Sequence, residues 1–188
     1  VENLPGILRC GVYPRNEFTK LPRQPIVSDN ARYDEKLDYT NMSIMFPNYL
    51  MWYRKREQEN NFWALLILDV FLMWKRECLF SPDNSARKNG DIDAKSGGEA
   101  FETLFNEPAD GIYRKDLGIP DSYPTNPQAE VLVPGIVEPS FINAIVVEDS
   151  NNYEAVKRVV GGEVEVIVNS SLYDNREDHR YWREREHV

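Results

Sequence analysis

The chain has 188 residues and a mass of 21.9 kDa, with 31 Asp and Glu against 22 Lys and Arg and a formal net charge of −9. An apolar content of 41% is close to the globular average, which excludes fibrous and disordered proteins. Two cysteines and two histidines are too few for a disulfide framework or a His-rich metal centre, and phosphate backbones repel so acidic a chain at long range.

The N-terminal part predicts one short helix and a long loop. Residues 1–14 are expected to form a helical turn with a cap, a first-turn proline and a stop, namely Asn3, Pro5 and Gly11. The proline-spaced stretch that follows, to about Thr40, is typical of an extended loop. Both cysteines, Cys10 and Cys78, are expected to be small core residues.

A continuous apolar run at residues 62–69 predicts a buried strand. The longer apolar stretch 62–74 contains Asp69 and is too short to span a bilayer. Because no signal peptide is visible either, we expect a cytoplasmic protein without membrane association.

The middle of the chain predicts a strand, a helix and two loops. Residues 78–80 form a second strand candidate, and residues 81–98 form a loop. Residues 99–106 place their apolar side chains on one face, which predicts a helix. Residues 107–127 form a long polar loop, and a loop of that length is usually functional or disordered.

The last third of the chain predicts a helix at residues 153–160, stopped by Gly161, and three strands at residues 128–133, 141–147 and 163–168. The charged tail, residues 173–188, is expected to be helical or frayed and solvated. Because these elements do not follow a regular β-α-β alternation, we expect a single α+β domain over residues 1–188 with an antiparallel or mixed sheet.

Glu130 is the carboxylate that stands out in these predicted elements. Strand alternation places it with Gln128 and Leu132 on one face, opposite Val131 and Val133. A glutamate in that setting either points into a pocket or is a solvated residue at the start of a strand. Composition alone favours the solvated interpretation.

Residues 41–56 combine aromatic and methionine side chains with three adjacent cations at residues 54–56. This combination suits base stacking with phosphate contacts, and it equally suits a core segment that ends in a solvated charge cluster. No metal site is expected. Residues 91–102 place acidic side chains as a calcium loop does, but Lys95 and Ser96 stand where such a loop needs a ligand and a glycine.

Six short stretches of the chain, taken in order, carry a family resemblance. The most specific are Ser-Ile-Met-Phe-Pro-Asn-Tyr-Leu-Met-Trp-Tyr at residues 43–53 and Pro-Gln-Ala-Glu-Val-Leu-Val at residues 127–133. The other four lie at residues 3–8, 78–86, 100–105 and 176–182. Together they span almost the whole chain and resemble the DarT family of NAD-dependent nucleic-acid ADP-ribosyltransferases, the toxins of a toxin–antitoxin system.

The resemblance implies an ADP-ribosyltransferase-like fold, with a split mixed or antiparallel sheet and flanking helices. It implies transfer of ADP-ribose from NAD to a base in single-stranded DNA, with Glu130 as the catalytic residue and no metal. The residues implied to bind NAD are Asn3, Leu4, Asn48, Met51 and Tyr53. Those implied to bind the nucleic acid are Arg54, Arg56, Tyr113, Arg114, Lys115, Tyr123 and Gln128.

Two departures from the family pattern bear on the substrate. The family's His-x-Thr does not precede Asn3, and Asn48 stands where the better-known branch has an arginine. The second departure implies the branch that acts on guanine rather than thymine. A DarG-like macrodomain antitoxin that removes ADP-ribose is the implied partner. The alternatives are the same chemistry on RNA or protein, and a non-catalytic relative that binds nucleotides or nucleic acid.

Overall fold

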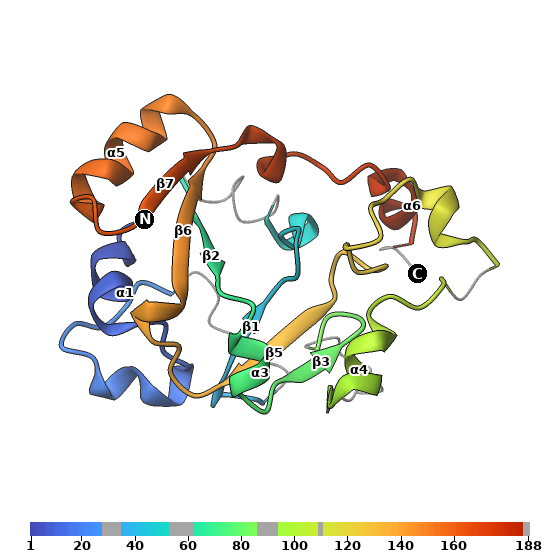
Figure 1. Ribbon diagram of the computed structural model, residues 1–188, viewed down its shortest axis with the longest axis horizontal. Helices are drawn as coiled ribbons and strands as arrows, with labels where there is room; N and C mark the ends of the chain where they lie inside the picture. Colours follow the sequence, from blue (N-terminus) through green and yellow to red (C-terminus); the bar gives the residue numbers. More distant parts are fainter. Residues whose placement is uncertain (28–34, 53–61, 86–93, 109–110, 186–188) are drawn as a thin grey trace.

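Two β-sheets form the centre of the molecule, with helices around them (Figure 1). The computed structural model describes residues 1–27, 35–52, 62–85, 94–108 and 111–185. Tyr53, Arg54 and Arg56 therefore lie outside the described residues, as does most of the loop between Ser85 and Ala94.

The first sheet is antiparallel throughout and has the strand order β1-β5-β3-β4. Its strands are β1 (Tyr39–Met42), β3 (Leu79–Ser81), β4 (Lys95–Ser96) and β5 (Glu130–Pro134). Strand β5 is central, and its three middle residues, Val131, Leu132 and Val133, are at most 3% exposed. β-Branched side chains suit such a position because they pack well on both faces of a pleated strand.

The second sheet is mixed and has the order β2-β6-β7. Strands β2 (Leu65–Leu68) and β6 (Ile142–Val147) are antiparallel, whereas β6 and β7 (Glu165–Val168) are parallel. Helix α5 (Ser150–Val160) makes the crossover between the parallel pair, as a parallel connection requires. The prediction of an α+β fold with antiparallel and mixed sheets is confirmed.

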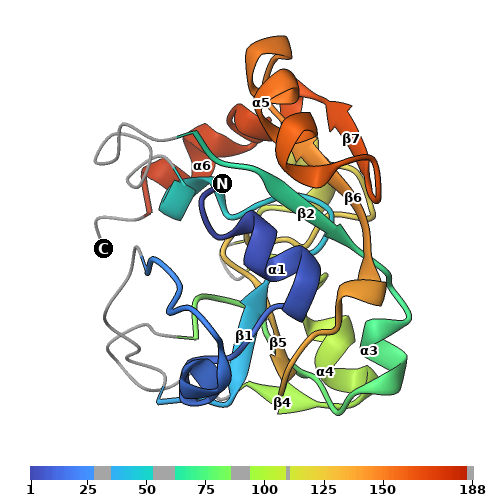
Figure 2. The same cartoon turned by 90° about the vertical axis from the view of Figure 1, so that its left-hand side faces the viewer.

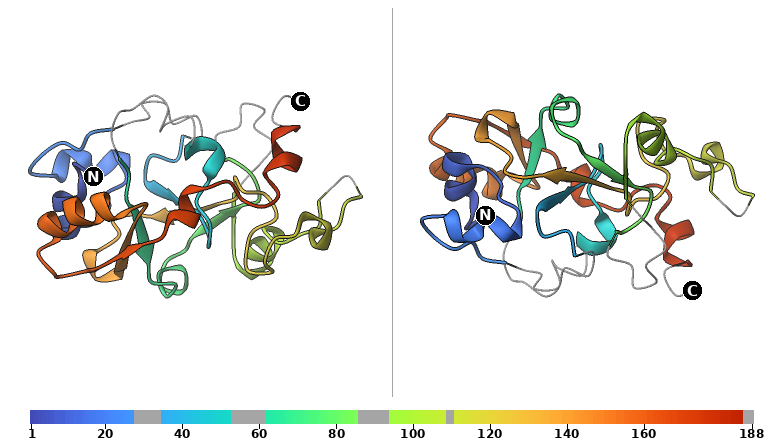
Figure 3. Two further views of the ribbon diagram at one scale, coloured as in Figure 1. Left: turned by 90° about the horizontal axis from the view of Figure 1, so that it is seen from above. Right: turned by 90° about the horizontal axis from the view of Figure 1, so that it is seen from below.

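The remaining helices are short: α1 (Leu4–Cys10), η1 (Arg15–Lys20), α3 (Leu72–Lys75), α4 (Gly98–Thr103), η2 (Arg114–Leu117), η3 (Pro139–Phe141), η4 (Ser170–Tyr173) and α6 (His179–Arg183). Helices α1 and α5 lie at one end of the molecule, whereas α4 and α6 lie at the other (Figure 3). Seen from the first end, α1 lies in front of the sheets (Figure 2). None of the helices in the described part of the chain is long and apolar enough to cross a membrane.

Each sheet has its own apolar core. Strands β3 and β5 pack with α4 around Phe80, Leu104 and Val131. Strands β6 and β7 pack with α1 and α5 around Ile145 and Val156.

A third, aromatic cluster contacts the second sheet. The Trp52 ring lies 5.2 Å from that of Tyr173, whose hydroxyl donates to the carbonyl of Val146 in β6. The helical turn at residues 49–52 and the C-terminal segment are therefore both anchored on the second sheet.

The N-terminal helix ends where the chain passes close to the segment after β5. Val12 and Val137 form an isolated antiparallel bridge, with hydrogen bonds of 2.8 and 2.9 Å. Gly11 has a φ of 97°, and a Cβ placed on it would lie 2.3 Å from the carbonyl oxygen of Val137. The predicted helix stop at Gly11 is confirmed, and this close approach is its physical reason.

Several predicted elements differ from the structure, and the stretches predicted as loops contain η1, the start of β1, β4 and η2. The run 62–69 forms only a four-residue strand, and it is half-buried, with Ile67 exposed at 39%, because β2 is an edge strand of its sheet. Helix α5 begins earlier than predicted, because the Asp149 carboxylate accepts a hydrogen bond from the N–H of Asn152 and caps it. The tail is not merely solvated, since Arg176 and Asp178 are buried.

Candidate active site

An open cavity of about 800 Å³ lies against strand β1 and the start of β5. Its other walls are the N-terminal segment with α1 and η1, and the helical turn at residues 49–52. Glu130, Gln128, Asn41 and Asn84 lie on its wall at the edge of the first sheet. The cavity is therefore built from segments that are far apart in the sequence.

Strand β5 directs Glu130 into this cavity. Ala129, Val131 and Val133 pack into the core of the first sheet, so the side chain of Glu130 points to the opposite face. Its backbone lies opposite Ser81 of β3, and Leu132 lies opposite Asn41 of β1.

The carboxylate of Glu130 is half-buried and accepts several hydrogen bonds. Its Oε2 accepts from the Ser85 hydroxyl at 2.6 Å, from the Ser85 N–H at 3.1 Å and from Asn41 Nδ2 at 3.0 Å. The interpretation of Glu130 as a solvated residue at a strand start is therefore wrong. Three donors on one oxygen suit an ionised carboxylate, which only accepts hydrogen bonds.

Among the described residues, three arginines line the cavity, together with the carboxylates of Glu2 and Glu130, although the chain as a whole is acidic. The arginines are Arg9 at the end of α1, Arg15 at the start of η1, and Arg23 in the loop that follows η1. Arginines on a concave wall attract anions, and the planar guanidinium matches phosphate oxygens. Sequence reasoning missed these arginines because they are isolated along the chain and only the fold brings them to one cavity.

Asn3 connects the start of α1 with the segment around Ile26, which follows η1. Its Nδ2 donates to the carbonyl of Ile26 at 2.8 Å, and its Oδ1 accepts from the N–H of Ile26 at 2.9 Å. Asn3 holds the N-cap position as predicted, but its side chain makes no capping bond because Ile26 occupies it. Asn3 and Ile26 both line the cavity.

Leu4 does not share this position. Its side chain is 3% exposed and packs in the core with Ile145 and Val156. The apolar face of α1 must be buried against the second sheet, so the cavity receives Asn3 and Pro5 instead. Of the described residues predicted to bind NAD, Leu4 alone does not line the cavity.

Asn48 and Met51 lie on the cavity wall beside Glu130. Asn48 is buried, and its Oδ1 accepts a hydrogen bond from the N–H of Met51 at 3.2 Å, so it caps the turn 49–52. Met51 is 50% exposed and presents a flexible apolar side chain.

The cysteines divide between the core and the cavity. Cys78 is buried as predicted, and burial raises the pKa of its thiol despite the nearby charge of Arg76. Cys10 lines the cavity instead of the core. No cluster of His, Cys, Asp and Glu that could hold a metal ion occurs in the part of the chain described above.

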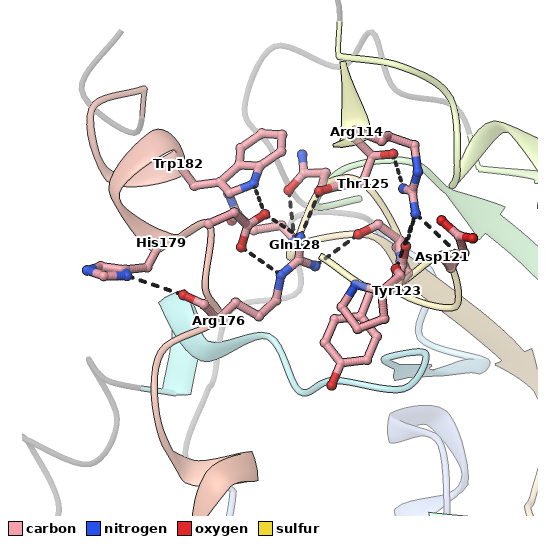
Figure 4. Close-up of polar contacts among 12 residues, drawn as sticks. Arg114, Asp121, Tyr123, Thr125, Gln128, Arg176, His179 and Trp182 are labelled. Carbon is pink, nitrogen blue, oxygen red and sulfur yellow. Dashed lines mark hydrogen bonds and ion pairs between the residues drawn. The ribbon is translucent and has the colours of Figure 1, made fainter. Parts of the chain in front are cut away.

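Arg114 belongs to the loop before β5 and forms hydrogen bonds with other residues of that loop (Figure 4). Its guanidinium donates to the Thr125 hydroxyl and to the carbonyls of Tyr123 at 2.8 Å and Asp121 at 3.2 Å. It also lies over the Phe105 ring. Arg114 therefore satisfies acceptors within the loop, and its predicted part in binding the substrate stays a prediction.

The other predicted substrate residues are spread over this region. Tyr113 is 56% exposed, with the Lys115 ammonium 5.1 Å from its ring centre. Tyr123 is half-buried, 5.5 Å from the ring of Phe46. Only Gln128 of the described residues in this set lines the cavity with Glu130.

Sequence reasoning missed a buried network in the C-terminal segment. Arg176 binds Asp178 through two hydrogen bonds, and donates to the carbonyls of Pro124 and Thr125 at 2.9 Å each (Figure 4). The indole N–H of Trp182 donates to Asp178 at 2.7 Å. The sequence signal that could have predicted this network is the Arg-x-Asp-x-x-x-Trp pattern, because its three side chains form hydrogen bonds with one another.

The sequence matches one protein-family model, described as ssDNA thymidine ADP-ribosyltransferase, DarT, over residues 1–174. No curated protein sequence matches the chain.

The fold is similar to solved structures of that family. Thermus sp. 2.9 DarT in complex with NAD+ is 16% identical, with a TM-score of 0.63 over 92% of each chain. The same protein in complex with ADP-ribosylated ssDNA gives a TM-score of 0.61, at 16% identity over 92% of this chain and 91% of that one. Thermosipho africanus DarTG in complex with ADP-ribose is 18% identical, with a TM-score of 0.62, and 92% of this chain spans only 48% of that one.

Proposed function

Because the chain belongs to the DarT family of ADP-ribosyltransferases, we propose that it transfers ADP-ribose from NAD to a base of single-stranded DNA and releases nicotinamide. The observation that carries the proposal is the position of Glu130. Its carboxylate lies on the wall of a cavity that is also lined by three arginines.

The two kinds of charge in the cavity fit the two charged parts of the reaction. Arg9, Arg15 and Arg23 suit the pyrophosphate of NAD. When the bond between the ribose C1′ and the nicotinamide nitrogen breaks, its electron pair leaves with nicotinamide and the ribose becomes oxocarbenium-like. The Glu130 carboxylate stabilises that developing positive charge, and C1′ then forms a bond to a nitrogen of the acceptor base, whose N–H proton is released to water.

The acceptor base has two candidates, which the same experiment compares. Thymine is the base that the description of the matching family model names. Guanine is the base that the resemblance implies from Asn48. Asn48 is buried and its Oδ1 caps a helical turn, and a carboxamide is not a base, so Asn48 does not take up the proton that the acceptor base loses.

We test the proposal by intact mass spectrometry of short oligonucleotides incubated with the protein and NAD. Each oligonucleotide carries one type of base, in DNA and RNA versions. We expect the mass of one ADP-ribose to be added to a thymine or guanine DNA oligonucleotide. Labelling of RNA alone contradicts the choice of DNA, and no labelling with NAD left intact supports a non-catalytic binding protein.

The first variant to compare is Glu130→Gln, which keeps the size of the side chain and removes its charge. We expect labelling and nicotinamide release to fall by at least about 100-fold, the scale on which preorganised electrostatic stabilisation acts. The melting temperature should stay close to that of the wild type. The matched control is Glu165→Gln, which removes an exposed carboxylate from β7 in the other sheet. Equal losses in both variants contradict a catalytic role for Glu130.

A macrodomain antitoxin is the partner that we propose. An ADP-ribosylated base blocks base pairing, so a cell with this activity needs an enzyme that reverses it. The labelled oligonucleotide from the experiment above is the substrate that tests this partner. Treatment with a DarG-type macrodomain should restore its original mass, and an unchanged mass contradicts the proposed pairing.

A further inference from the structure

Asn41 and Ser85 surround one oxygen of the Glu130 carboxylate. All three hydrogen bonds given above end on Oε2, and Asn41 Nδ2 also lies 3.3 Å from the Ser85 hydroxyl oxygen. The three side chains therefore form a polar cluster on the cavity side of the first sheet.

The two donor residues come from opposite sides of β5. Asn41 belongs to β1, where its backbone lies opposite Leu132. Ser85 lies four positions after Ser81, the residue of β3 whose backbone lies opposite Glu130. The sheet hydrogen bonds are made by backbone groups, so neither side chain is needed to pair the strands. This leaves their common contact with Glu130 to be explained.

We propose that Asn41 and Ser85 are positioning residues, which hold the Glu130 carboxylate in the orientation that stabilises the ribose cation. The inference rests on the proposed function of the same cavity. A glutamate side chain has three rotatable bonds, and an unrestrained carboxylate must be ordered during each turnover. Donors that fix one oxygen in advance remove that reorganisation, which is how preorganised sites accelerate a reaction.

The Ser85 side chain can be removed without removing its backbone donor. Ser85→Ala loses the 2.6 Å hydroxyl bond and keeps the 3.1 Å bond from the N–H. Ser85→Thr keeps both. Asn41→Ala removes the third donor from the other side of the carboxylate. The three variants therefore separate the donors from one another.

The experiment measures nicotinamide release at a series of NAD concentrations for each variant. A hydrogen bond to a charged group contributes enough free energy that its removal from the transition state lowers the rate by about 10- to 100-fold. We expect kcat to fall by that factor in Ser85→Ala and in Asn41→Ala. KM for NAD should change by less than about 3-fold, because the arginines are untouched, and Ser85→Thr should restore most of kcat.

Two controls separate positioning from a general loss of structure. Ser171→Ala removes a hydroxyl whose bond, to Asn169, lies outside the cavity, so kcat should not change. In a Glu130→Asp background the shorter carboxylate no longer reaches the donors, so Ser85→Ala should reduce the remaining rate by less than about 3-fold. An undiminished effect in that background means that Ser85 does not act through Glu130.

Other results overturn the inference in recognisable ways. If the wild type releases nicotinamide and both alanine variants keep its kcat, the inference fails and the proposed function stands. A lowered melting temperature with no rescue by Ser85→Thr assigns Ser85 a purely structural role. If the wild type neither releases nicotinamide nor labels an oligonucleotide, the proposed function fails and the inference falls with it.

Discussion

Gly11 shows how one residue holds the wall of the cavity in place. It ends α1, and its backbone lies against Val137, in the segment that follows β5. The same residue therefore controls both the end of the helix and the approach of the N-terminal segment to the strand that carries Glu130.

Gly11→Ala should lower the free energy of unfolding by at least about 2 kcal/mol, since the positive φ is strained for alanine and the new Cβ meets a backbone oxygen that cannot rotate away. Urea unfolding followed by circular dichroism measures the change. Gly6→Ala is the matched control, because Gly6 lies inside α1 with nothing within 4 Å of its position for a Cβ. Gly6→Ala should raise stability slightly, by about 0.5–1 kcal/mol. A Gly11→Ala variant as stable as the control contradicts the close approach.

Single residues also mark the limit of sequence-based prediction at the site. The alternation around Glu130 was enough to single it out, because period-two patterning is local. Its donors were not predicted, because Asn41 and Ser85 are 89 and 45 positions away from it along the chain. A hydrogen bond over such a separation depends on strand order, which hydrophobic patterning does not specify.

The C-terminal segment is the element that holds the loop before β5. Arg176 and Arg114 donate to neighbouring carbonyls of that loop, one from each side of Thr125 (Figure 4). Buried carbonyls require donors, and two guanidinium groups supply them where the loop has no regular structure.

Arg176→Ala should lower the free energy of unfolding by about 3–5 kcal/mol, because it leaves Asp178 buried without its cation and two loop carbonyls without donors. Arg176→Lys should recover only part of this loss, since an ammonium cannot reproduce the planar fork. Urea unfolding of both variants is the measurement.

A second ion pair of this protein serves as the control. Arg76 pairs with Glu138 on the surface, and Arg76→Ala should cost at most about 1 kcal/mol. The hydrogen bond from Arg76 lowers the pKa of Glu138, so this small contribution is present at neutral pH and is lost as the pH falls through that lowered pKa. A loss in Arg176→Ala no larger than that of Arg76→Ala contradicts a structural role for the buried network.

Some elements of the fold were predicted well from the sequence and others were not, depending on how local the sequence signal is. Strands β3, β5 and β6 were predicted nearly in place, because each is a short apolar run bounded by turn residues. The tail was misjudged because its charges suggest solvent, whereas Arg176 and Asp178 neutralise each other in the interior. The start of α5 was missed because Asp149 was not considered as a cap.

At the scale of the whole molecule, charge is distributed unevenly. The net charge is −9, and the cations that the resemblance implies for nucleic-acid binding are Arg54, Arg56, Arg114 and Lys115. Among the described residues, Arg114 is occupied within its loop, and it is Arg9, Arg15 and Arg23 that line the cavity.

Replacing these three arginines with glutamine should raise KM for NAD by at least about 10-fold, with a smaller effect on kcat, because binding of the pyrophosphate is lost in the ground state and the transition state alike. Steady-state nicotinamide release measures both constants.

A variant with the same net charge provides the control for these arginines. Lys157, Arg158 and Arg183 are exposed on α5 and α6, outside the cavity, and their replacement by glutamine should leave KM within about 2-fold. Equal increases in the two variants mean that overall charge, and not the cavity, attracts NAD.

If Glu130 is the catalytic residue, as we propose, the order of strands in the first sheet also bears on when the active site is completed during synthesis. Strand β5 lies between β1 and β3 but is translated after both of them and after β4. A ribosome-bound chain that has exposed β1 and β3 therefore holds Asn41 and Ser85 without the strand that joins them. Since proteins are made from the N-terminus, the proposed active site cannot assemble on the ribosome before β5 has been synthesised.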